Sequence, residues 1–487
     1  MKFEYEFKRD IYYDIKDIIE NSISNITFLL GPRKCGKTVC LKQIERNFEN
    51  TQYTNFKLLN DKESRKKFDE INEAISKNQP IVYLLDEITY AFYPEKEIYQ
   101  IADTFSEVEN TNTKIVFTGS QSNALEIWAN RAFSGNVNKI KADFLTYSEF
   151  LRYKNLSEIS EKTYNQFLFE ASEFYKFNSL EEYLRGCLEE TIISNSKTSN
   201  YIMGNECYLL TENNIDTLID ICYQTLFTLH NQVNAQTFAK SNKIYDDISN
   251  YFRHICNQME DNELADLIEK SFINKYNSFK SKPLDSLKQA YLFLYKCDLI
   301  SITPVTGSIT NIPNIFQSLY IPGGQINYKD ELYKTFNICI NYPMFYVRIL
   351  QDILKDKMPE TLPKMLLGSI VECHARGLLP KTGFEYRDID SNEVDYVNLS
   401  EGVAIEFTVS NKTNKNVHFN CLPEELDKIL LTKDIADDNN GVRKIPYYEF
   451  LYQLSHGSIK ELAKIPLEKC DYDKNEKESL YEEDRSI

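Results

Sequence analysis

Short apolar runs alternate with amphipathic stretches in the first part of the chain. The runs 26–30, 81–85 and 115–117 end in turn or polar residues, and stretches such as VCLKQIERNF place apolar residues at helical spacing between them. Apolar runs of this length are typical of buried strands, and strands that alternate with helices form a parallel sheet covered on both faces. The pattern therefore predicts an α/β domain over residues 23–150, preceded by a lead-in helix within residues 1–22.

Helical periodicity dominates residues 151–355. Near the end of this region, SLKQAYLFLYKCDLI is followed by SITPV, a TGS turn and ITNI. A helix followed by a small hairpin is the outline of a winged helix. A helical bundle with a surface hairpin fits the same pattern, so both interpretations stay open.

A third pattern occupies residues 356–466. The helix-like segment GSIVECHARGLL precedes three strand-like segments, FEYRD, NEVDYVNLS and GVAIEFTVS, which are separated by turn residues. Two further segments follow, LPEELDKILLTKD and IPYYEFLYQLS, so we expect a mixed α/β domain. The highly charged residues 467–487 are predicted to form a frayed tail.

A complete G-x-x-x-x-G-K-[ST] motif follows the first apolar run. The predicted nucleotide-binding segment consists of Gly31, Pro32, Arg33, Lys34, Cys35, Gly36, Lys37, Thr38 and Val39. The glycines let several backbone N–H groups converge on one phosphate, and the following helix adds the positive end of its dipole. We expect Lys37 to reach the β- and γ-phosphates of ATP and the Thr38 hydroxyl to bind Mg²⁺.

Two carboxylates, Asp86 and Glu87, end the second apolar run. Asp86 is predicted to hold Mg²⁺ and Glu87 to polarise the attacking water. A buried strand followed by a solvated acidic turn is the alternative, but it does not explain why two parts of a phosphoryl-transfer site coincide. The third run ends in Thr118-Gly119-Ser120, where Thr118 or Ser120 either senses the γ-phosphate or only forms a turn.

Together, GPRKCGKT, YLLDEI, KIVFTGSQSNAL, FSGNV and FLTYSEFLRY resemble a group of prokaryotic AAA+ ATPases. The resemblance continues through LEEYLRGCL, LKQAYLFLYKCDLI, LLGSIVE, EVDYV, AIEFT and ILLTKD, and so covers most of the chain. It implies a P-loop AAA+ domain, a winged-helix-like middle region and a C-terminal domain with the PD-(D/E)XK, or restriction-endonuclease-like, fold. The family's arginine after serine-glycine is Asn136 here, which leaves the arginine finger unidentified, with Arg131 as the nearest candidate.

The resemblance also implies a second site, in which a helix glutamate, a strand aspartate and E-x-K on the next strand hold Mg²⁺. The matching residues are Glu372, Asp395 and Glu406, but Thr408 stands at the lysine position and Lys412 lies four residues further on. The lysine of such a site positions the attacking water. Its replacement favours a nuclease-like fold without catalysis, in which the carboxylates are remnants or binding groups, over an active nuclease.

Composition narrows the class of partners. The 487 residues include 73 Asp and Glu against 56 Lys and Arg, and the net charge of −17 excludes a general nucleic-acid coat but not a local basic face. No apolar run approaches the ~20 residues of a membrane span, and the N-terminus has no apolar signal-peptide core. We therefore expect a cytoplasmic protein that does not engage membranes.

The combined expectation is an ATPase that uses ATP and Mg²⁺ to drive a conformational switch. A homo-oligomer is a further expectation, as is a DNA or protein partner for the winged-helix-like region. Two alternatives remain: an ATP-gated, metal-dependent nuclease, and a nucleotide-dependent partner-binding switch with an inactive nuclease-like domain.

Overall fold

The computed structural model describes most of the first 197 residues and about two thirds of residues 293–455. The described residues are 7–108, 111–133, 136–175, 179–197, 216, 293–295, 297–306, 320–321, 325–326, 336–354, 362, 364–380, 383–387, 393–411, 419–420, 422–439 and 441–455. The predicted tail and most of the predicted winged-helix segment lie outside these residues. Within them, no helix is both long enough and apolar enough to cross a membrane.

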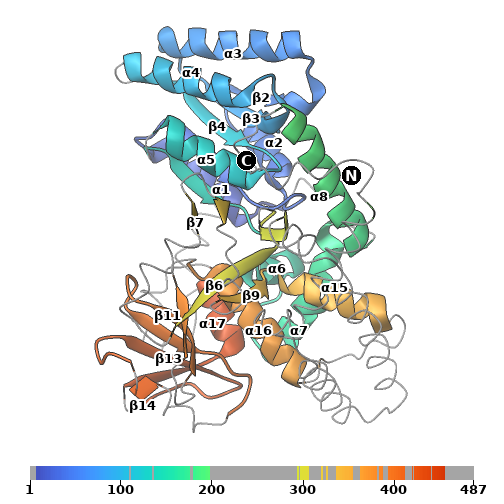
Figure 1. Ribbon diagram of the computed structural model, residues 1–487, viewed down its shortest axis with the longest axis vertical. Coiled ribbons are helices and arrows are strands. Elements are labelled where there is room, and N and C mark those ends of the chain that lie inside the picture. The colour runs from blue at the N-terminus through green and yellow to red at the C-terminus, as the bar shows by residue number, and fades with distance from the viewer. Residues whose placement is uncertain are drawn as a thin grey trace.

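A parallel five-stranded sheet forms the upper domain in Figure 1. Its strands are β1 (Ile26–Leu30), β2 (Thr51–Asn55), β3 (Val82–Asp86), β4 (Lys114–Thr118) and β5 (Asn138–Lys141), in the order β2-β3-β4-β1-β5. The three apolar runs became β1, β3 and β4, as predicted. The edge strands β2 and β5 were missed because their sequences, TQYTN and NKIK, are mostly polar and only partly buried.

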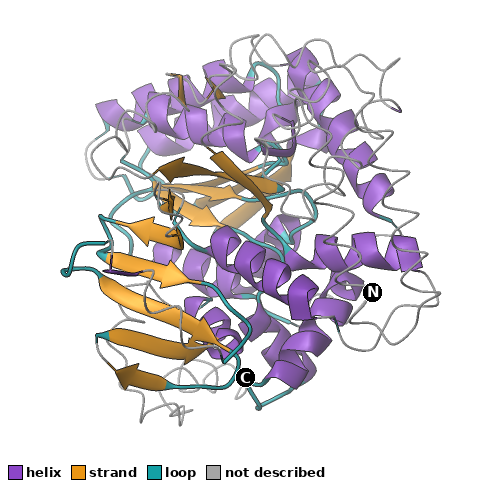
Figure 2. Cartoon of the chain, turned by 60° about the horizontal axis from the view of Figure 1, so that its bottom comes forward, coloured by secondary structure: helices purple, strands orange, loops and turns teal. Residues whose placement is uncertain are grey.

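Helices cover both faces of this sheet (Figure 2). One face carries α3 (Asp61–Ser76), α4 (Pro94–Glu107) and α5 (Ser122–Ala132), and the other carries α1 (Asp10–Asn21) and α2 (Lys37–Asn47). Successive side chains of a strand point to opposite faces. Accordingly, Phe28 packs with the first group of helices and Leu29 with the second. The predicted lead-in helix corresponds to α1.

A mixed eight-stranded sheet lies at the lower left of Figure 1, in the order β14-β15-β13-β12-β11-β10-β6-β9. Its strands are β6 (Ile300–Thr306), β9 (Phe336–Ile340), β10 (Phe384–Arg387), β11 (Glu393–Asn398), β12 (Val403–Glu406), β13 (Asp427–Thr432), β14 (Asp437–Asn439) and β15 (Val442–Pro446). The expected C-terminal mixed sheet is therefore present.

Strand β6 contains the SITPV segment, for which a hairpin is predicted. It pairs antiparallel with β9 and parallel with β10, and its expected hairpin partner, ITNI, lies outside the described residues. Since β6 and β9 precede residue 356, the sheet draws strands from both sides of the predicted boundary at 355/356. A separate two-stranded ribbon pairs β7 (Tyr320–Ile321) with β8 (Gln325–Ile326).

Further helices connect the two sheets. They are α6 (Tyr147–Lys154), α7 (Glu161–Glu170), α8 (Leu180–Lys197), α15 (Pro343–Leu354), α16 (Lys364–Leu378) and α17 (Tyr447–Leu454), with 3₁₀ turns η2 (Phe56–Leu58), η3 (Ile88–Tyr90) and η4 (Ala171–Tyr175). One apolar cluster runs from α1 and α2 through these helices to the eight-stranded sheet. The two parts of the molecule therefore share a hydrophobic core.

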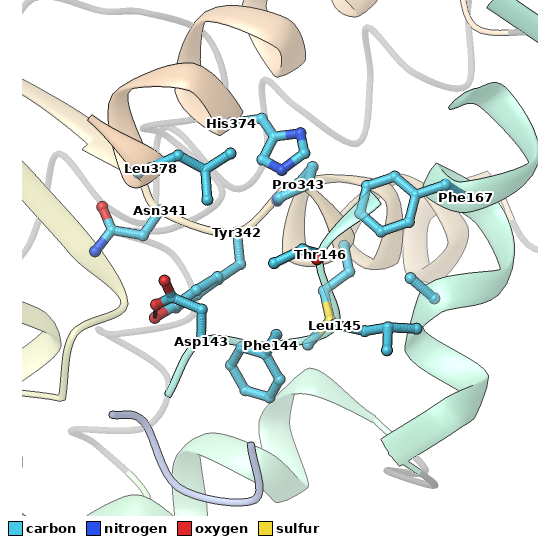
Figure 3. A pocket seen from close by; sticks show the side chains of 13 residues that line it. Asp143, Phe144, Leu145, Thr146, Phe167, Asn341, Tyr342, Pro343, His374 and Leu378 are labelled. Atoms are coloured by element: carbon cyan, nitrogen blue, oxygen red, sulfur yellow. Dashed lines mark hydrogen bonds between the residues drawn. The ribbon is translucent and has the colours of Figure 1, made fainter. Parts of the chain in front are cut away.

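A small pocket marks the junction between the two parts (Figure 3). There the Tyr342 hydroxyl donates to the Asp143 carboxylate at 3.1 Å and to Asp298 at 2.9 Å. His374 is also buried at this junction, with Nδ1 3.0 Å from the Tyr164 hydroxyl. Burial lowers the pKa of His374 to about 3, so the ring is neutral and is a hydrogen-bonded part of the core.

Candidate nucleotide-binding site

The phosphate loop connects β1 to α2, and two glycines permit its path. Gly31 has φ +147°, and a Cβ there would lie 1.9 Å from the carbonyl oxygen of Ala142. Gly36 has φ +105°, a conformation that favours glycine. Because α2 begins at Lys37, the unpaired N–H groups of its first turn, which includes Thr38 and Val39, face the loop.

The Lys37 ammonium is buried within this loop. Its Nζ donates to the carbonyl oxygens of Gly31 at 2.8 Å and Pro32 at 2.7 Å. These contacts place one positive charge beside the backbone N–H groups of the loop. Of the other loop residues, Lys34 is exposed and Cys35 is fully buried.

The predicted magnesium ligands lie side by side. The Thr38 hydroxyl donates to Asp86 Oδ2 at 2.8 Å, and Asp86 is buried at the end of β3. The same carboxylate oxygen accepts from the Tyr53 hydroxyl at 2.7 Å and from Asn55 Nδ2 at 3.4 Å. A hydroxyl and a carboxylate are oxygen donors of the kind that Mg²⁺ prefers, so the residues fit this ion.

Tyr53 and Asn55 were not predicted from the sequence. They lie on β2, where Asn55 pairs in register with Asp86. Their spacing of two residues puts both side chains on one face of the strand, which is the only signal that the sequence offers.

Glu87 follows Asp86 in the left-handed conformation, with φ 52°. Its carboxylate accepts from the Ser120 hydroxyl at 2.8 and 3.0 Å and from the Ser120 N–H at 3.2 Å. Burial and the neighbouring Asp86 charge raise the pKa of Glu87 above its ordinary value. Of the two hydroxyl candidates, Ser120 thus reaches this site, while Thr118 donates to the Leu29 carbonyl at 2.9 Å.

Helix α8 lies against the phosphate loop, on the right of the upper domain in Figure 1. Its Glu190 forms ion pairs with Arg33 at 2.9 Å and with Lys57 at 3.1 Å. The Tyr183 hydroxyl of the same helix donates to the Arg33 carbonyl at 3.2 Å. A small pocket opens here between Arg33, Ser120 and Glu190. Glu190 was missed because it lies outside the phosphate-binding motifs.

Arg131, the candidate arginine finger, and Asn136, at the position of the family's arginine, are both exposed. Arg131 lies in the last turn of α5, and Asn136 lies in the following loop. Neither residue is identified as an arginine finger by its place in the structure.

The C-terminal carboxylates surround a buried arginine. Arg376 Nε donates to Glu372 at 3.0 Å, and its Nη2 donates to Glu385 at 3.1 Å. Asp395 accepts from the Phe407 N–H at 2.7 Å. Burial and the charge of Glu406 raise the pKa of Asp395 well above its usual range. Arg376 and Glu385 were not predicted from the sequence.

The predicted nuclease-like site also includes the position of the missing lysine and a possible metal site. The Thr408 hydroxyl lies 3.1 Å from the Ser410 hydroxyl, and Lys412 is outside the described residues. Across the part of the chain that is described, no three or more His, Cys, Asp or Glu side chains are grouped to hold a metal ion. The assignment of Glu372, Asp395 and Glu406 to a nuclease-like site stays a prediction.

Comparison with known proteins identifies the upper domain. Residues 24–151 match a family model described as "AAA domain". No curated protein sequence matched the chain.

Solved structures with similarity include AMPPCP-bound DnaA from Aquifex aeolicus, at 16% identity and a TM-score of 0.23, covering 59% of this chain and 94% of that chain. A replication initiator DnaA bound to AMPPCP and single-stranded DNA has 16% identity and a TM-score of 0.25, with coverages of 60% and 89%. The Thermotoga maritima RuvB Holliday junction branch migration motor has 10% identity and a TM-score of 0.22, with coverages of 67% and 94%.

The assignment of the upper domain depends on the family match and on the phosphate-loop geometry. Residues 24–151 therefore form a P-loop AAA domain.

Proposed function

We propose that the protein binds ATP with Mg²⁺ and hydrolyses it. The observation that carries the proposal is the meeting of the Thr38 hydroxyl and the Asp86 carboxylate at 2.8 Å beside a complete phosphate loop. The loop amides and Lys37 bind the phosphates, and Thr38 and Asp86 hold the ion. Bound Mg²⁺ neutralises charge on the phosphate oxygens.

Glu87 is the proposed general base. It is fixed by Ser120 and lies next to Asp86 in sequence. A raised pKa makes a carboxylate a stronger base, which suits the removal of a proton from water near neutral pH. Glu87 orients the attacking water and receives its proton.

The proposed output is a conformational switch that begins at α8. Glu190 forms ion pairs with Arg33 of the phosphate loop and with Lys57. A bound polyphosphate brings like charge toward Glu190 and competes for the same two cations, so nucleotide binding favours movement of α8. The shared hydrophobic core supports transmission to the C-terminal region.

Affinity and turnover of three proteins test the proposal: the wild type, Lys37→Ala and Glu87→Gln. Glu87→Gln keeps ATP affinity but loses turnover by roughly 10²–10⁴-fold, the usual contribution of a general base. Lys37→Ala loses affinity and turnover. Glu126→Gln, on the exposed side of α5, is the matched control and is expected to resemble the wild type. If the wild type neither binds nor hydrolyses ATP or GTP, the proposal fails.

For the C-terminal region we propose a nuclease-like fold without catalysis. The order of helix α16, the antiparallel strands β10–β12 and then β13 parallel to β12 supports the fold. Arg376 supports the loss of catalysis, because it already supplies a positive charge to the acidic cluster. Incubation with plasmid and single-stranded DNA plus Mg²⁺ or Mn²⁺ is expected to give no cleavage. Cleavage that Asp395→Ala abolishes would contradict this.

The proposal also keeps three further expectations. These are the domain limits, a homo-oligomer, and a DNA or protein partner of residues 151–355. Size-exclusion chromatography with light scattering, with and without a non-hydrolysable ATP analogue and a DNA duplex, tests the last two. No change in mass with either addition would count against them.

A further inference from the structure

Arg9 is a buried arginine that precedes α1 and lies outside every nucleotide-binding motif. Its guanidinium forms a two-pronged pair with Glu149 of α6, with Nε–Oε1 at 3.1 Å and Nη2–Oε2 at 2.6 Å. The remaining nitrogen, Nη1, donates to the carbonyl of Cys35 in the phosphate loop and, at 2.9 Å, to the carbonyl of Asp143. One side chain therefore connects three segments that are far apart in sequence.

The contact with Cys35 restricts the orientation of one peptide group of the phosphate loop. The Cys35 carbonyl and the Gly36 N–H belong to the same peptide plane and point in opposite directions, because the bond is trans. A carbonyl held by Arg9 therefore turns the Gly36 N–H away from Arg9. A Cβ on Gly36 would lie only 3.6 Å from Arg9 Nη1, so the guanidinium packs directly against this residue.

Glu149 keeps the guanidinium in place. Its carboxylate also accepts from the backbone N–H groups of Asp10 at 2.9 Å and Thr146 at 3.0 Å. Although burial favours the neutral acid, the charge and hydrogen bonds of Arg9 hold the pKa of Glu149 below its ordinary value. A permanently charged, planar donor is thus fixed by an ionised partner, and this geometry suits Arg and not Lys.

We propose that Arg9 is a positioning residue of the nucleotide site, which turns the Gly36 N–H toward the β-phosphate of the bound nucleotide. The inference depends on the proposed nucleotide binding. Because ATP and ADP both carry a β-phosphate, Arg9 contributes equally to the affinity for each. It does not act on the attacking water, so turnover at saturating ATP is independent of it.

The test compares Arg9→Lys with Arg152→Lys. Arg152 also connects α6 to the start of α1, through an ion pair with Asp10 at 2.6 Å, and this shared placement makes it the matched control. We expect Arg9→Lys to bind ATP and ADP about tenfold more weakly, the effect of one lost charge-assisted hydrogen bond, with kcat within about twofold of the wild type. Arg152→Lys is expected to keep both affinities.

The result that overturns the inference is a folded Arg9→Lys protein with wild-type affinity for ADP, or an equal loss in Arg152→Lys. If Arg9→Lys does not fold by circular dichroism, Glu149→Gln replaces it, because an amide oxygen still accepts one hydrogen bond from Arg9 while the charge is removed. A smaller loss of affinity for both nucleotides is then expected, and unchanged affinity overturns the inference. A wild type that binds no nucleotide refutes the proposed function itself and is recognised before any variant is compared.

Discussion

Two groups of acidic residues lie beside the two sheets of this protein, and they differ in what binds their oxygens. In the nucleotide site, Asp86 and Glu87 accept hydrogen bonds from neutral hydroxyls, chiefly those of Thr38, Tyr53 and Ser120. In the C-terminal region the Arg376 guanidinium instead binds two of the acids, Glu372 and Glu385. Neutral donors orient a carboxylate and leave its charge in place, whereas an arginine also neutralises it.

This difference determines which group can attract a divalent cation. A cluster with uncompensated negative charge gains from Mg²⁺, because the ion supplies the missing positive charge. A cluster that already contains Arg376 gains less and would have to displace or repel that side chain. The same residue types at strand ends can therefore form a reactive site in one sheet and an internal ion-pair network in the other.

The largest expected effect comes from removing the arginine of the C-terminal cluster. Arg376→Met leaves Glu372 and Glu385 buried without their counter-charge, and should lower the free energy of unfolding by about 3–5 kcal/mol. Urea unfolding followed by circular dichroism measures the change. Lys433→Met breaks an exposed pair with Glu161 and is expected to cost no more than about 1 kcal/mol. If both changes lowered the free energy of unfolding equally, Arg376 would contribute no more than an exposed ion pair does. The contrast between the C-terminal cluster and the nucleotide site would then be lost.

A smaller effect is expected for Asp395→Asn, and it should be stabilising. Burial and Glu406 raise the pKa of Asp395 in the folded protein, so the folded state holds its proton more tightly than the unfolded chain does. The free energy of unfolding therefore falls as pH rises from about 4, the unfolded value, through the raised pKa. The amide does not titrate and can still accept from the Phe407 N–H.

Thermal unfolding between pH 4 and pH 8 measures this effect. At pH 8 the free energy of unfolding of the variant should exceed that of the wild type by roughly 1–3 kcal/mol, the usual cost of a buried polar group whose hydrogen bonds are incomplete. At pH 4 the difference should be small. Asp438→Asn, on the exposed edge of the same sheet, controls for loss of a negative charge. Destabilisation at pH 8 would indicate that the ionised carboxylate is needed, as in a metal site.

The smallest effect is expected for Tyr53→Phe in the nucleotide site. The change removes the hydroxyl that donates to Asp86 at 2.7 Å and thereby orients this carboxylate. The loss of this hydrogen bond should weaken the binding of Mg²⁺ by about 1 kcal/mol. The Mg²⁺ concentration for half-maximal ATP hydrolysis should then rise about fivefold, with little change in maximal rate. Tyr93→Phe, at an exposed position before α4, should leave the Mg²⁺ dependence unchanged. A lower Mg²⁺ requirement in Tyr53→Phe would show that the hydroxyl competes with the ion.

Local patterns account for what the sequence predicts well. The strands β1, β3 and β4 are mostly buried and therefore read as apolar runs, and the phosphate loop has glycine at two of its positive-φ positions, Gly31 and Gly36. Asp86 and Ser120 follow directly from these strands. The edge strand β2 carries no such signal, because partly exposed positions accept polar residues.

Contacts between distant segments account for what the sequence does not show. Arg9 and Glu149 are 140 residues apart, and each alone resembles an ordinary charged residue of a helix end. Arg376 of α16 and Glu385 of β10 likewise meet only in the packed structure. The pairing of charges across elements depends on the packed structure, whereas the phosphate-loop motif depends on a few consecutive residues.

The hydrophobic core that passes from α1 and α2 into the C-terminal helices has a consequence for fragments of this protein. A fragment cut to residues 24–151, the stretch recognised by the family model, would lose Arg9 and would uncover apolar side chains of α6 such as Tyr147 and Phe150. Such a piece would be expected to aggregate. The stretch that the family model recognises is therefore not expected to fold by itself, and any fragment or chimaera should carry α1 and α6–α8 along with it.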